Sequence, residues 1–418
     1  MREGMKVTFF ATATASIGGI GQYTQQLLPR LVSLLVRKGC DVTLLLSKDS
    51  LFGSEGKRVR VVRLPVTRAN RQMRVLWEHA YAAALAWGAD VFVSLESRLP
   101  LVPIAAKRLL VVVHDLFPFL EKLQPERYPP EHGCLKGLYW RLVVRQAVMR
   151  AHRIITDSDS AAGELKAVFG VTPDRLRTIY PGIDHVRFRR IDGPQALRDL
   201  RKRYNLPEAF YLYVSGPGAR KNLRLIMETY AQTVLAPEAR LPVVATMTEP
   251  AGSAFESLSN LLRESGAADL FRFIGYIPDE ELPFLYAASR ALLYPSLHEG
   301  FGLPPIEAMA CGTPAIVSNR ASLPEVVGDA AFVFDPDRPG TFVAALHEVN
   351  VDSARQAVIA KGLRRARSFS WEETAERIAC EILALCPQRS GRRAREINET
   401  VPPVPSGLAS PAADRIHE

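Results

Sequence analysis

Short apolar runs alternate with amphipathic stretches from the beginning of the chain almost to its end, and this alternation restricts the possible folds more than any other feature. The runs are continuously apolar and often β-branched, which is typical of strands covered on both faces. Helical patterns at 23–37, 71–87 and 134–150 lie between some of them. Strands that alternate with helices predict a parallel sheet with helices on both faces. In the first half of the chain the predicted strands are 6–10, 41–46, 58–63, 90–94, 109–113 and 153–156.

A polar stretch rich in proline and arginine, 180–205, interrupts the alternation once. Strand-like runs then resume at 210–214, 242–247, 271–274, 290–294 and 314–317. We therefore expect two α/β domains in tandem, 1–186 and 187–370, followed by a helix over 371–386. Ser370 and Glu373 have the spacing of a capping box at the start of that helix. The remaining segment, 387–418, is rich in Pro, Ser, Arg and Ala and is predicted to be disordered.

Composition excludes several classes of protein. The five cysteines are scattered without a C-x-x-C pair, which argues against a zinc site or a disulfide framework and favours a reducing compartment. No apolar run is long enough for a signal peptide before Gly18 or for a spanning helix, so we expect a cytoplasmic protein. The net charge of +9 favours anionic ligands but does not choose among nucleotides, nucleic acids and an acidic membrane face.

A glycine-rich loop, with Gly18, Gly19 and Gly21, follows the first predicted strand and opens the first helix. Glycines allow a sharp turn and a close approach to a ligand, and the helix N-terminus favours negative charge. A dinucleotide site uses the same physics, but its G-x-G-x-x-G fingerprint fails at Thr24. A tight turn without a ligand remains an alternative.

A basic turn follows the first strand of the second domain and contains Arg220, Lys221 and Asn222. Two adjacent cations at a helix entrance suit a diphosphate, since arginine can bind it in bidentate fashion and lysine as a point charge. Asn222 is a candidate N-cap. A solvated basic pair on a surface turn is the competing interpretation.

The segment from His298 to Glu307 is the most informative part of the sequence. A loop with two glycines leads into Pro304-Pro305, and proline suits the first turn of a helix. Glu299 is therefore expected in the loop and Glu307 early on the helix, on either side of an anion site at the helix N-terminus. Both carboxylates could accept hydrogen bonds from hydroxyls of a sugar and a ribose. A glycosidase would instead place its carboxylates on either side of the scissile bond. The backbone N–H groups expected to face the anion are those of Phe301, Gly302 and Leu303.

This segment resembles the E-x7-E motif of the retaining GT-B glycosyltransferases of family four, also called group 1. The resemblance covers about 5–385, with the motifs in the family's order. It implies a GT-B fold, in which two Rossmann-like domains face each other across a cleft and a C-terminal helix packs back toward the N-terminal domain. Further segments similar to the family are Gly18-Gly19-Ile20-Gly21, His114-Asp115-Leu116, Thr156-Asp157-Ser158, Tyr180-Pro181-Gly182-Ile183-Asp184, Arg220-Lys221-Asn222 and Ser322-Leu323-Pro324-Glu325.

The resemblance also implies roles for individual residues. Glu299 would bind hydroxyls of the donor sugar and stabilise the developing oxocarbenium ion, and Glu307 would hold the ribose. Arg220 and Lys221 would neutralise the leaving diphosphate, while the amides of Phe301, Gly302 and Leu303 would contact the donor's sugar and phosphates. Many relatives have Gly-Arg where this chain has Ser215-Gly216. The resemblance therefore leaves open which role each of Arg220 and Lys221 has at the diphosphate.

On the N-terminal side of the cleft, the resemblance implies that His114 faces the donor sugar and that Gly18, Gly19 and Gly21 lie near the acceptor. A histidine at a strand end with local hydrogen bonds is the alternative for His114. The N-terminal domain would bind the acceptor, and the C-terminal domain would bind the nucleotide sugar.

The implied reaction transfers a hexosyl group from a nucleotide sugar to an acceptor hydroxyl with retention, without a cofactor and without a metal. The motifs are most similar to those of bacterial mannosyltransferases that use GDP-mannose. The acceptor would be a glycan or a polyprenyl-diphosphate-linked oligosaccharide in polysaccharide biosynthesis. Aromatic residues interleaved with cations over 117–153 suggest peripheral contact with an anionic membrane at its cytoplasmic face. No nucleic acid partner is expected.

Several alternatives stay open at this point. The donor could be a UDP-sugar instead of GDP-mannose. A sugar-nucleotide epimerase, a phosphorylase or a sugar-nucleotide binder without activity could share the fold. A dinucleotide-dependent oxidoreductase is the alternative from a different class.

Overall fold

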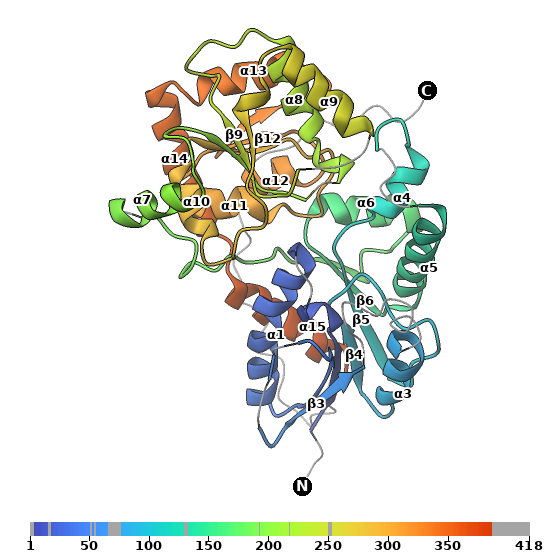
Figure 1. The fold of residues 1–418 in the computed structure, drawn as a ribbon. Helices are drawn as coiled ribbons and strands as arrows, with labels where there is room; N and C mark the ends of the chain where they lie inside the picture. Colours follow the sequence, from blue (N-terminus) through green and yellow to red (C-terminus); the bar gives the residue numbers. More distant parts are fainter. Residues whose placement is uncertain are drawn as a thin grey trace.

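The structure is a computed structural model that describes residues 4–15, 18–50, 52–53, 56–65, 77–128, 133–191, 193–216, 218–249 and 253–386. The chain forms two α/β parts, one containing the N-terminal half and the other most of the C-terminal half (Figure 1). The segment 387–418, for which disorder is predicted, lies outside the described residues, as do part of the glycine-rich loop and 71–76 of a predicted helix.

The N-terminal part is built on a seven-stranded sheet in which every pairing is parallel. Side chains alternate along each strand, and both faces are buried: Phe9 joins one apolar cluster and Phe10 another. This explains why the strands are continuously apolar. In spatial order the strands are β3 (Val59–Leu64), β2 (Asp41–Ser47), β1 (Lys6–Phe10), β4 (Val91–Ser94), β5 (Arg108–Val113), β6 (Arg153–Thr156) and β7 (Leu176–Thr178).

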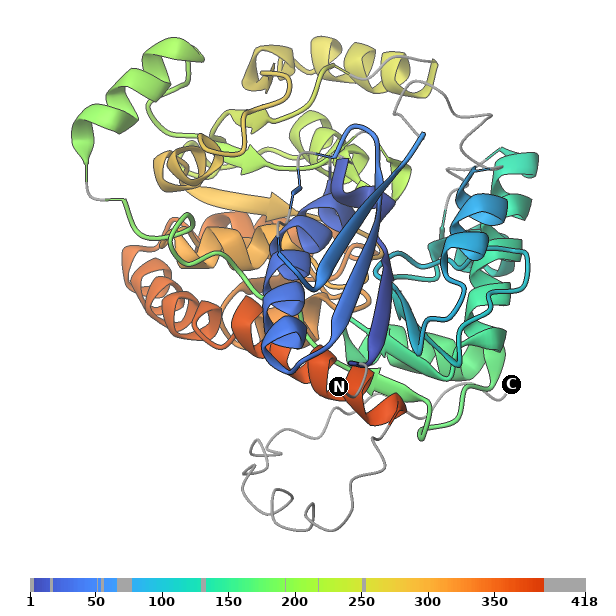
Figure 2. The same cartoon turned by 90° about the horizontal axis from the view of Figure 1, so that it is seen from below.

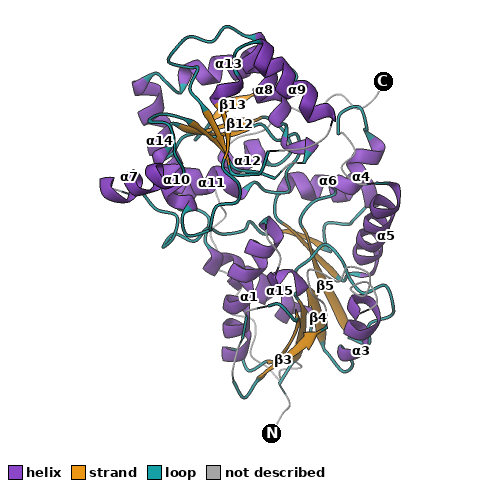
Figure 3. Cartoon of the chain, in the orientation of Figure 1, coloured by secondary structure: helices purple, strands orange, loops and turns teal. Residues whose placement is uncertain are grey.

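Helices cover both faces of this sheet, as Figure 3 shows. Strands lie between most of them along the chain, and one of the elements, η2, is a single π-helical turn. The elements are η1 (Thr12–Ala15), α1 (Gly19–Arg37), η2 (Trp77–Tyr81), α3 (Ala82–Leu85), α4 (Phe117–Leu123), α5 (Cys134–Arg150) and α6 (Asp159–Phe169).

The C-terminal part repeats this architecture with a six-stranded parallel sheet. Its spatial order is β10 (Phe271–Phe273), β9 (Val243–Ala245), β8 (Tyr211–Tyr213), β11 (Ala291–Tyr294), β12 (Ala315–Ser318) and β13 (Phe332–Phe334). Two apolar clusters again cover the two faces of the sheet. The helices are α7 (Pro194–Arg203), η3 (Ala219–Lys221), α8 (Leu223–Gln232), α9 (Ser253–Glu264), η4 (Ala268–Leu270), α10 (Leu282–Ala288), α11 (Leu303–Ala310), α12 (Leu323–Val327), α13 (Pro339–Glu348) and α14 (Asp352–Ala366).

The last helix, α15 (Trp371–Leu385), returns to the N-terminal part and packs beside α1, as Figures 1 and 2 show. Trp371 and Ile378 of α15 belong to the same apolar cluster as the buried face of α1. Ser370 caps the helix by accepting a hydrogen bond from the N–H of Glu373, as its spacing predicts. The two segments that connect the parts run side by side, since the N–H of Ile183 donates to the carbonyl of Phe369 (3.3 Å).

Three details differ from the sequence-based expectations. The strands β7 and β13 have no predicted counterpart, and α7 forms inside the stretch that we interpreted as a polar connection. Asn222 does not cap α8 with its side chain, so that prediction is wrong. It adopts a left-handed conformation (φ 56°), and its side-chain amide donates instead to the carbonyl of Pro295 (3.2 Å).

Candidate active site

The segment from His298 to Glu307 lies at the carboxyl edge of the C-terminal sheet. It follows β11 as a loop and continues into α11, with Pro304 in the first turn, as expected. Gly302 precedes the helix with φ +97°, and a Cβ there would lie 2.7 Å from Leu323 Cδ2. The positive φ favours glycine at this position, and a Cβ would also displace the end of the Leu323 side chain.

Glu299 is the centre of a buried cluster of charges. Its Oε1 accepts hydrogen bonds from Lys221 Nζ (2.6 Å) and from the Tyr294 hydroxyl (2.9 Å). Its Oε2 lies 3.4 Å from Arg220 Nη1, which also donates to the carbonyl of His298 (3.1 Å). The structure thus brings together the two cations of η3 and the first carboxylate of the predicted motif.

The cations keep Glu299 ionised. Burial by itself would raise the pKa of this carboxyl group, which is only 8% exposed. The charges of Lys221 and Arg220 outweigh burial and lower the pKa to about 2. The site therefore presents a permanent carboxylate that can accept hydrogen bonds from hydroxyl groups, next to two cations that can bind phosphate oxygens.

Glu307 lies in a different environment, although it is also buried. Its Oε1 accepts a hydrogen bond from Gln22 Nε2 of α1 (2.9 Å), and its Oε2 accepts one from the Tyr286 hydroxyl (2.9 Å). Burial raises the pKa of Glu307, and these two hydrogen bonds offset part of the increase. The two carboxylates of the motif thus differ in the charge that surrounds them.

The described part of the glycine-rich loop lies beside Glu307, because Gln22 follows Gly21 directly. Gly18 has φ +104° and is exposed together with Gly19, whereas Gly21 is buried within α1. Ser16 and Ile17 of this loop lie outside the described residues.

The turn that precedes this loop is held by a buried ionic cluster that the sequence did not reveal. Glu96 accepts hydrogen bonds from the Thr12 hydroxyl (2.9 Å) and from the N–H of Ala13 (2.6 Å). Arg98 pairs with Glu96 and also with Glu78 (3.1 Å). Burial would lower the pKa of Arg98, but the two carboxylates raise it, so its charge is permanent. The cluster fixes the first residues after β1.

His114 lies beside the segment, but its ring is turned into the N-terminal part. Nδ1 lies 2.6 Å from Asp157 Oδ2, and Nε2 lies 3.0 Å from the carbonyl oxygen of Leu95. Burial would lower the pKa of His114, but Asp157 raises it to about 9, so both ring nitrogens donate. The contact with the segment is made by the backbone: a Cβ at Gly300 would lie 1.9 Å from the His114 carbonyl oxygen. The expected role of His114 toward a donor sugar stays a prediction.

Further contacts hold the segment against the N-terminal part. The Ser158 hydroxyl donates to the carbonyl of Gly300 (2.6 Å), and His298 Nε2 lies 2.7 Å from Glu164 Oε1. Glu325 accepts hydrogen bonds from the first N–H groups of α6, at Asp159 (2.7 Å) and Ser160 (3.1 Å). The candidate site is therefore assembled from both parts of the chain.

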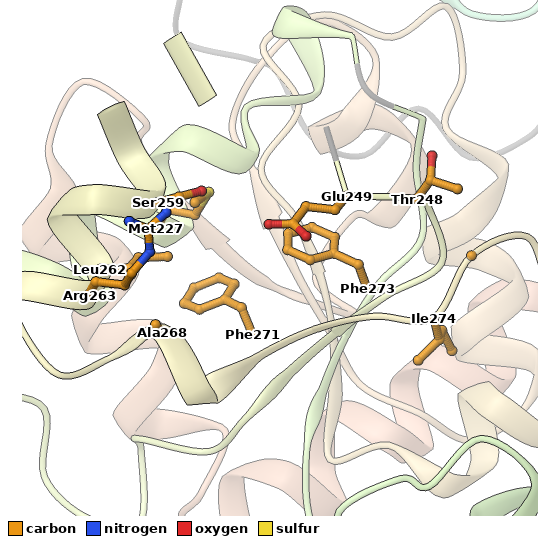
Figure 4. Close-up of a pocket in the computed structure, with 11 residues that line it drawn as sticks. Met227, Thr248, Glu249, Ser259, Leu262, Arg263, Ala268, Phe271, Phe273 and Ile274 are labelled. Atoms are coloured by element: carbon orange, nitrogen blue, oxygen red, sulfur yellow. The ribbon is translucent and has the colours of Figure 1, made fainter. Parts of the chain in front are cut away.

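A separate pocket of about 570 Å³ opens beyond β9 and β10 and is shown in Figure 4. Phe271, Phe273 and Ile274 line it, together with Arg263 of α9 and Glu249. It runs along β10, the edge strand of the sheet, because its lining includes Ala268 before this strand and Gly275 after it. None of the residues in contact with Glu299 or Glu307 lines it.

Two α/β parts, each built on a parallel sheet, with a buried charge cluster at the carboxyl edge of the second sheet, have the architecture of the GT-B glycosyltransferases. Residues 17–187 match the family described as Glycosyltransferase Family 4, and residues 198–365 match Glycosyl transferases group 1. The O-antigen chain mannosyltransferase B of Escherichia coli is 33% identical over 273 residues, which cover 65% of this chain and 69% of that protein. The chain belongs to the group 1 glycosyltransferases of family four, as the sequence motifs indicate.

A further relative agrees with this assignment, and a solved structure agrees with the fold. The serotype-specific mannosyltransferase WbdA of Escherichia coli is 32% identical over 275 residues, or 64% of this chain, but the matched region spans only 32% of WbdA. The solved structure of sucrose-phosphate synthase from Thermosynechococcus elongatus has a TM-score of 0.70 at 21% identity, covering 91% of this chain and 99% of that one. The predicted GT-B fold class is confirmed.

Proposed function

We propose that this glycosyltransferase transfers a hexosyl group from a nucleoside-diphosphate sugar to an acceptor hydroxyl with retention of the anomeric configuration. The observation that carries the proposal is the buried cluster of Glu299, Lys221 and Arg220 at the N-terminal end of α11. A carboxylate that stays ionised beside two cations suits a substrate that carries hydroxyls at one end and a diphosphate at the other.

The chemistry follows from where charge develops. As the bond between the anomeric carbon and the diphosphate oxygen breaks, positive charge grows on the sugar ring and negative charge on the diphosphate. Glu299 would stabilise the positive charge on the sugar ring. The negative charge on the diphosphate would be stabilised by Arg220, Lys221 and the N-terminal end of α11. The acceptor hydroxyl would form the new bond on the same face and give its proton to the departing diphosphate. Glu307 would hold the ribose, and the proposed mechanism needs no metal because the two cations offset the diphosphate charge.

GDP-mannose is the proposed donor, and the growing end of a glycan or a lipid-linked oligosaccharide is the proposed acceptor. Support comes from the Escherichia coli relatives, whose names describe mannosyltransferases, one of them acting on the O-antigen chain. We place the reaction at the cytoplasmic side of the membrane, where the nucleotide sugar would be available. None of the helices in the described part of the chain combines the length and apolarity needed to cross a bilayer.

Ligand-induced thermal shifts test the donor. A ligand that binds only the native state raises its apparent stability, so GDP-mannose should shift the unfolding temperature more than UDP-glucose, ADP-glucose or NAD. The shift with GDP-mannose should disappear in the Arg220→Ala/Lys221→Ala variant. A larger shift with UDP-glucose would replace the proposed donor, and a shift with NAD alone would contradict a sugar-nucleotide site.

Product analysis tests the reaction. Glu299→Gln should reduce transfer from GDP-mannose by roughly a hundredfold or more, because a neutral amide cannot balance the developing positive charge. Glu348→Gln, at an exposed position of α13, serves as the matched control. NMR of the product should show the anomeric configuration of the donor. An inverted product, or full activity in Glu299→Gln, would overturn the mechanism.

A further inference from the structure

The helix α5 carries apolar residues on both of its faces. Its inner face packs into the N-terminal core through Val143, Val144, Ala147 and Val148. Its outer face exposes four large apolar side chains: Leu135 (83%), Leu138 (57%), Leu142 (46%) and Met149 (58%). A surface helix of a globular protein ordinarily turns polar residues outward, so this outer face needs an explanation.

The four side chains form a continuous stripe. Successive helical residues turn by about 100°, which places these four within an arc of about 60°. No other helix in the described residues carries more than one large hydrophobic side chain that is this exposed. The stripe is therefore a local property of α5, and Figure 1 shows this helix at the outer edge of the N-terminal part.

The charged residues of α5 itself all have the same sign. The helix contains no acidic residue, and exposed cations lie on both sides of the stripe, at Lys136 on one side and Arg145 on the other. Arg141, on the side of Arg145, is held to α4 by a hydrogen bond to the carbonyl of Pro118 (3.2 Å). A second copy of this chain, docking through the same face, would bring these cations against their own equivalents, which disfavours self-association.

We propose that the outer face of α5, formed by Leu135, Leu138, Leu142 and Met149 with Lys136 and Arg145, docks on an anionic lipid surface. Apolar side chains that enter the acyl boundary and cations that stay at the headgroups are the two contributions such binding needs. The inference rests on the proposed function for the lipid-linked acceptor. The docking face lies close to the candidate active site, because α5 packs on α4 and the Phe117 ring of α4 lies 5.3 Å from the Arg220 guanidinium.

Vesicle binding of the full chain tests this proposal. The protein should co-sediment with vesicles of phosphatidylglycerol and phosphatidylethanolamine and much less with vesicles of phosphatidylcholine. The variant Leu135→Gln/Leu138→Gln/Leu142→Gln should lose this binding. The control Val186→Gln/Val234→Gln, which removes two apolar side chains that are 84% and 94% exposed elsewhere, should bind like the wild type.

A second variant separates the charge from the apolar stripe. Lys136→Gln/Arg145→Gln should weaken binding to the anionic vesicles by roughly thirtyfold, since each cation near the surface contributes about a factor of five. Added salt should reduce wild-type binding and affect this variant less. Absence of wild-type binding at low salt, or equal binding by the apolar variant, would overturn the proposal. So would a wild-type dimer that the apolar variant converts to a monomer, since a second copy would then cover the face.

The test is independent of the donor assignment. All variants should keep the wild-type thermal shift with GDP-mannose, because the outer face of α5 contains none of the residues around Glu299. If the apolar variant loses vesicle binding but keeps the thermal shift with GDP-mannose, the result supports the docking face. A missing nucleotide shift with intact vesicle binding would instead contradict the proposed function and leave the docking face standing.

Discussion

Lys221→Met is the perturbation that most directly tests the charge cluster. The substitution keeps most of the apolar stem of the side chain but removes the ammonium group that lies 2.6 Å from Glu299 Oε1. Glu299 would keep Arg220, 3.4 Å away, and the hydroxyl of Tyr294. We expect a destabilised protein at neutral pH, because a buried carboxylate loses the closest charge that stabilises it.

The size of the expected loss of stability follows from the pKa of Glu299. The group has an ordinary pKa of 4.5 and titrates near 2 in the folded chain, because the two cations outweigh the effect of burial. By linkage this difference corresponds to about 3 kcal/mol of stability above pH 4.5, which is lost as the pH falls toward 2. Lys221 is the closer and stronger of the two charges, so its removal should cost about 2 kcal/mol at pH 7.

Urea unfolding followed by circular dichroism measures this cost. The loss in Lys221→Met should be nearly constant from pH 7 to about pH 4.5 and shrink below it. In a Glu299→Gln background the same substitution should cost little, giving a coupling of about 2 kcal/mol in a double-mutant cycle. Lys361→Met, which removes an exposed partner of Asp329, should cost less than about 1 kcal/mol. Equal losses in the wild-type and Glu299→Gln backgrounds would refute the reasoning.

Two further predictions concern the contacts of His114. Gly300→Ala should lower transfer by roughly a hundredfold, because its Cβ would meet the His114 carbonyl oxygen and force the two parts of the chain apart. Gly163→Ala, where a Cβ meets nothing within 4 Å, is the matched control, and equal activities of the two variants would contradict the contact. Asp157→Asn should change the pH dependence of unfolding. The raised pKa of His114, about 9 against 6.5, gives stability that is complete below pH 6.5 and lost as the pH rises through 9. The variant should lack this loss, and an unchanged pH profile would show that Asp157 does not keep His114 protonated.

The sequence predicted most strands to within one or two residues, for example β1 and β6, because a strand buried on both faces must be continuously apolar. The strand β7 lacks that signal, because Arg177 stands at its centre. The strand β13 is apolar at all three positions, although Val333 is 44% exposed, and its length does not separate it from the three-residue strands β8, β9 and β10 that were predicted. The helix α7 was missed because its sequence is strongly basic and polar, with a single residue, Leu200, among the most buried side chains.

Within the candidate site, the sequence predicted what is local and missed what depends on distant elements. Glu299 and Glu307 could be placed on a loop and a helix because the glycines and prolines around them fix the local backbone. The resemblance brought Arg220 and Lys221 to the same site as Glu299, but the partners of Glu307 could not be predicted. Gln22 reaches Glu307 from a helix 285 positions earlier in the chain, and no pattern near either residue signals the contact. The buried Asp157, which turns the ring of His114 away from the segment, lies 43 positions from it.

The contacts of Glu299 and Glu307 depend to different degrees on how the two parts of the chain are positioned. The cations that hold Glu299 come from η3, in the same part as Glu299 itself, so both ion pairs of this cluster lie within the C-terminal part. Glu307 depends on Gln22 for one of its two hydrogen bonds, and Gly300 rests directly on the backbone of His114. Separation of the parts would therefore leave the charges at the proposed diphosphate site intact. It would remove a hydrogen-bond donor from the proposed ribose ligand and open the side of the site that is proposed to face the acceptor. Under the proposed function, binding of the diphosphate and completion of the transfer site would thus be separable steps.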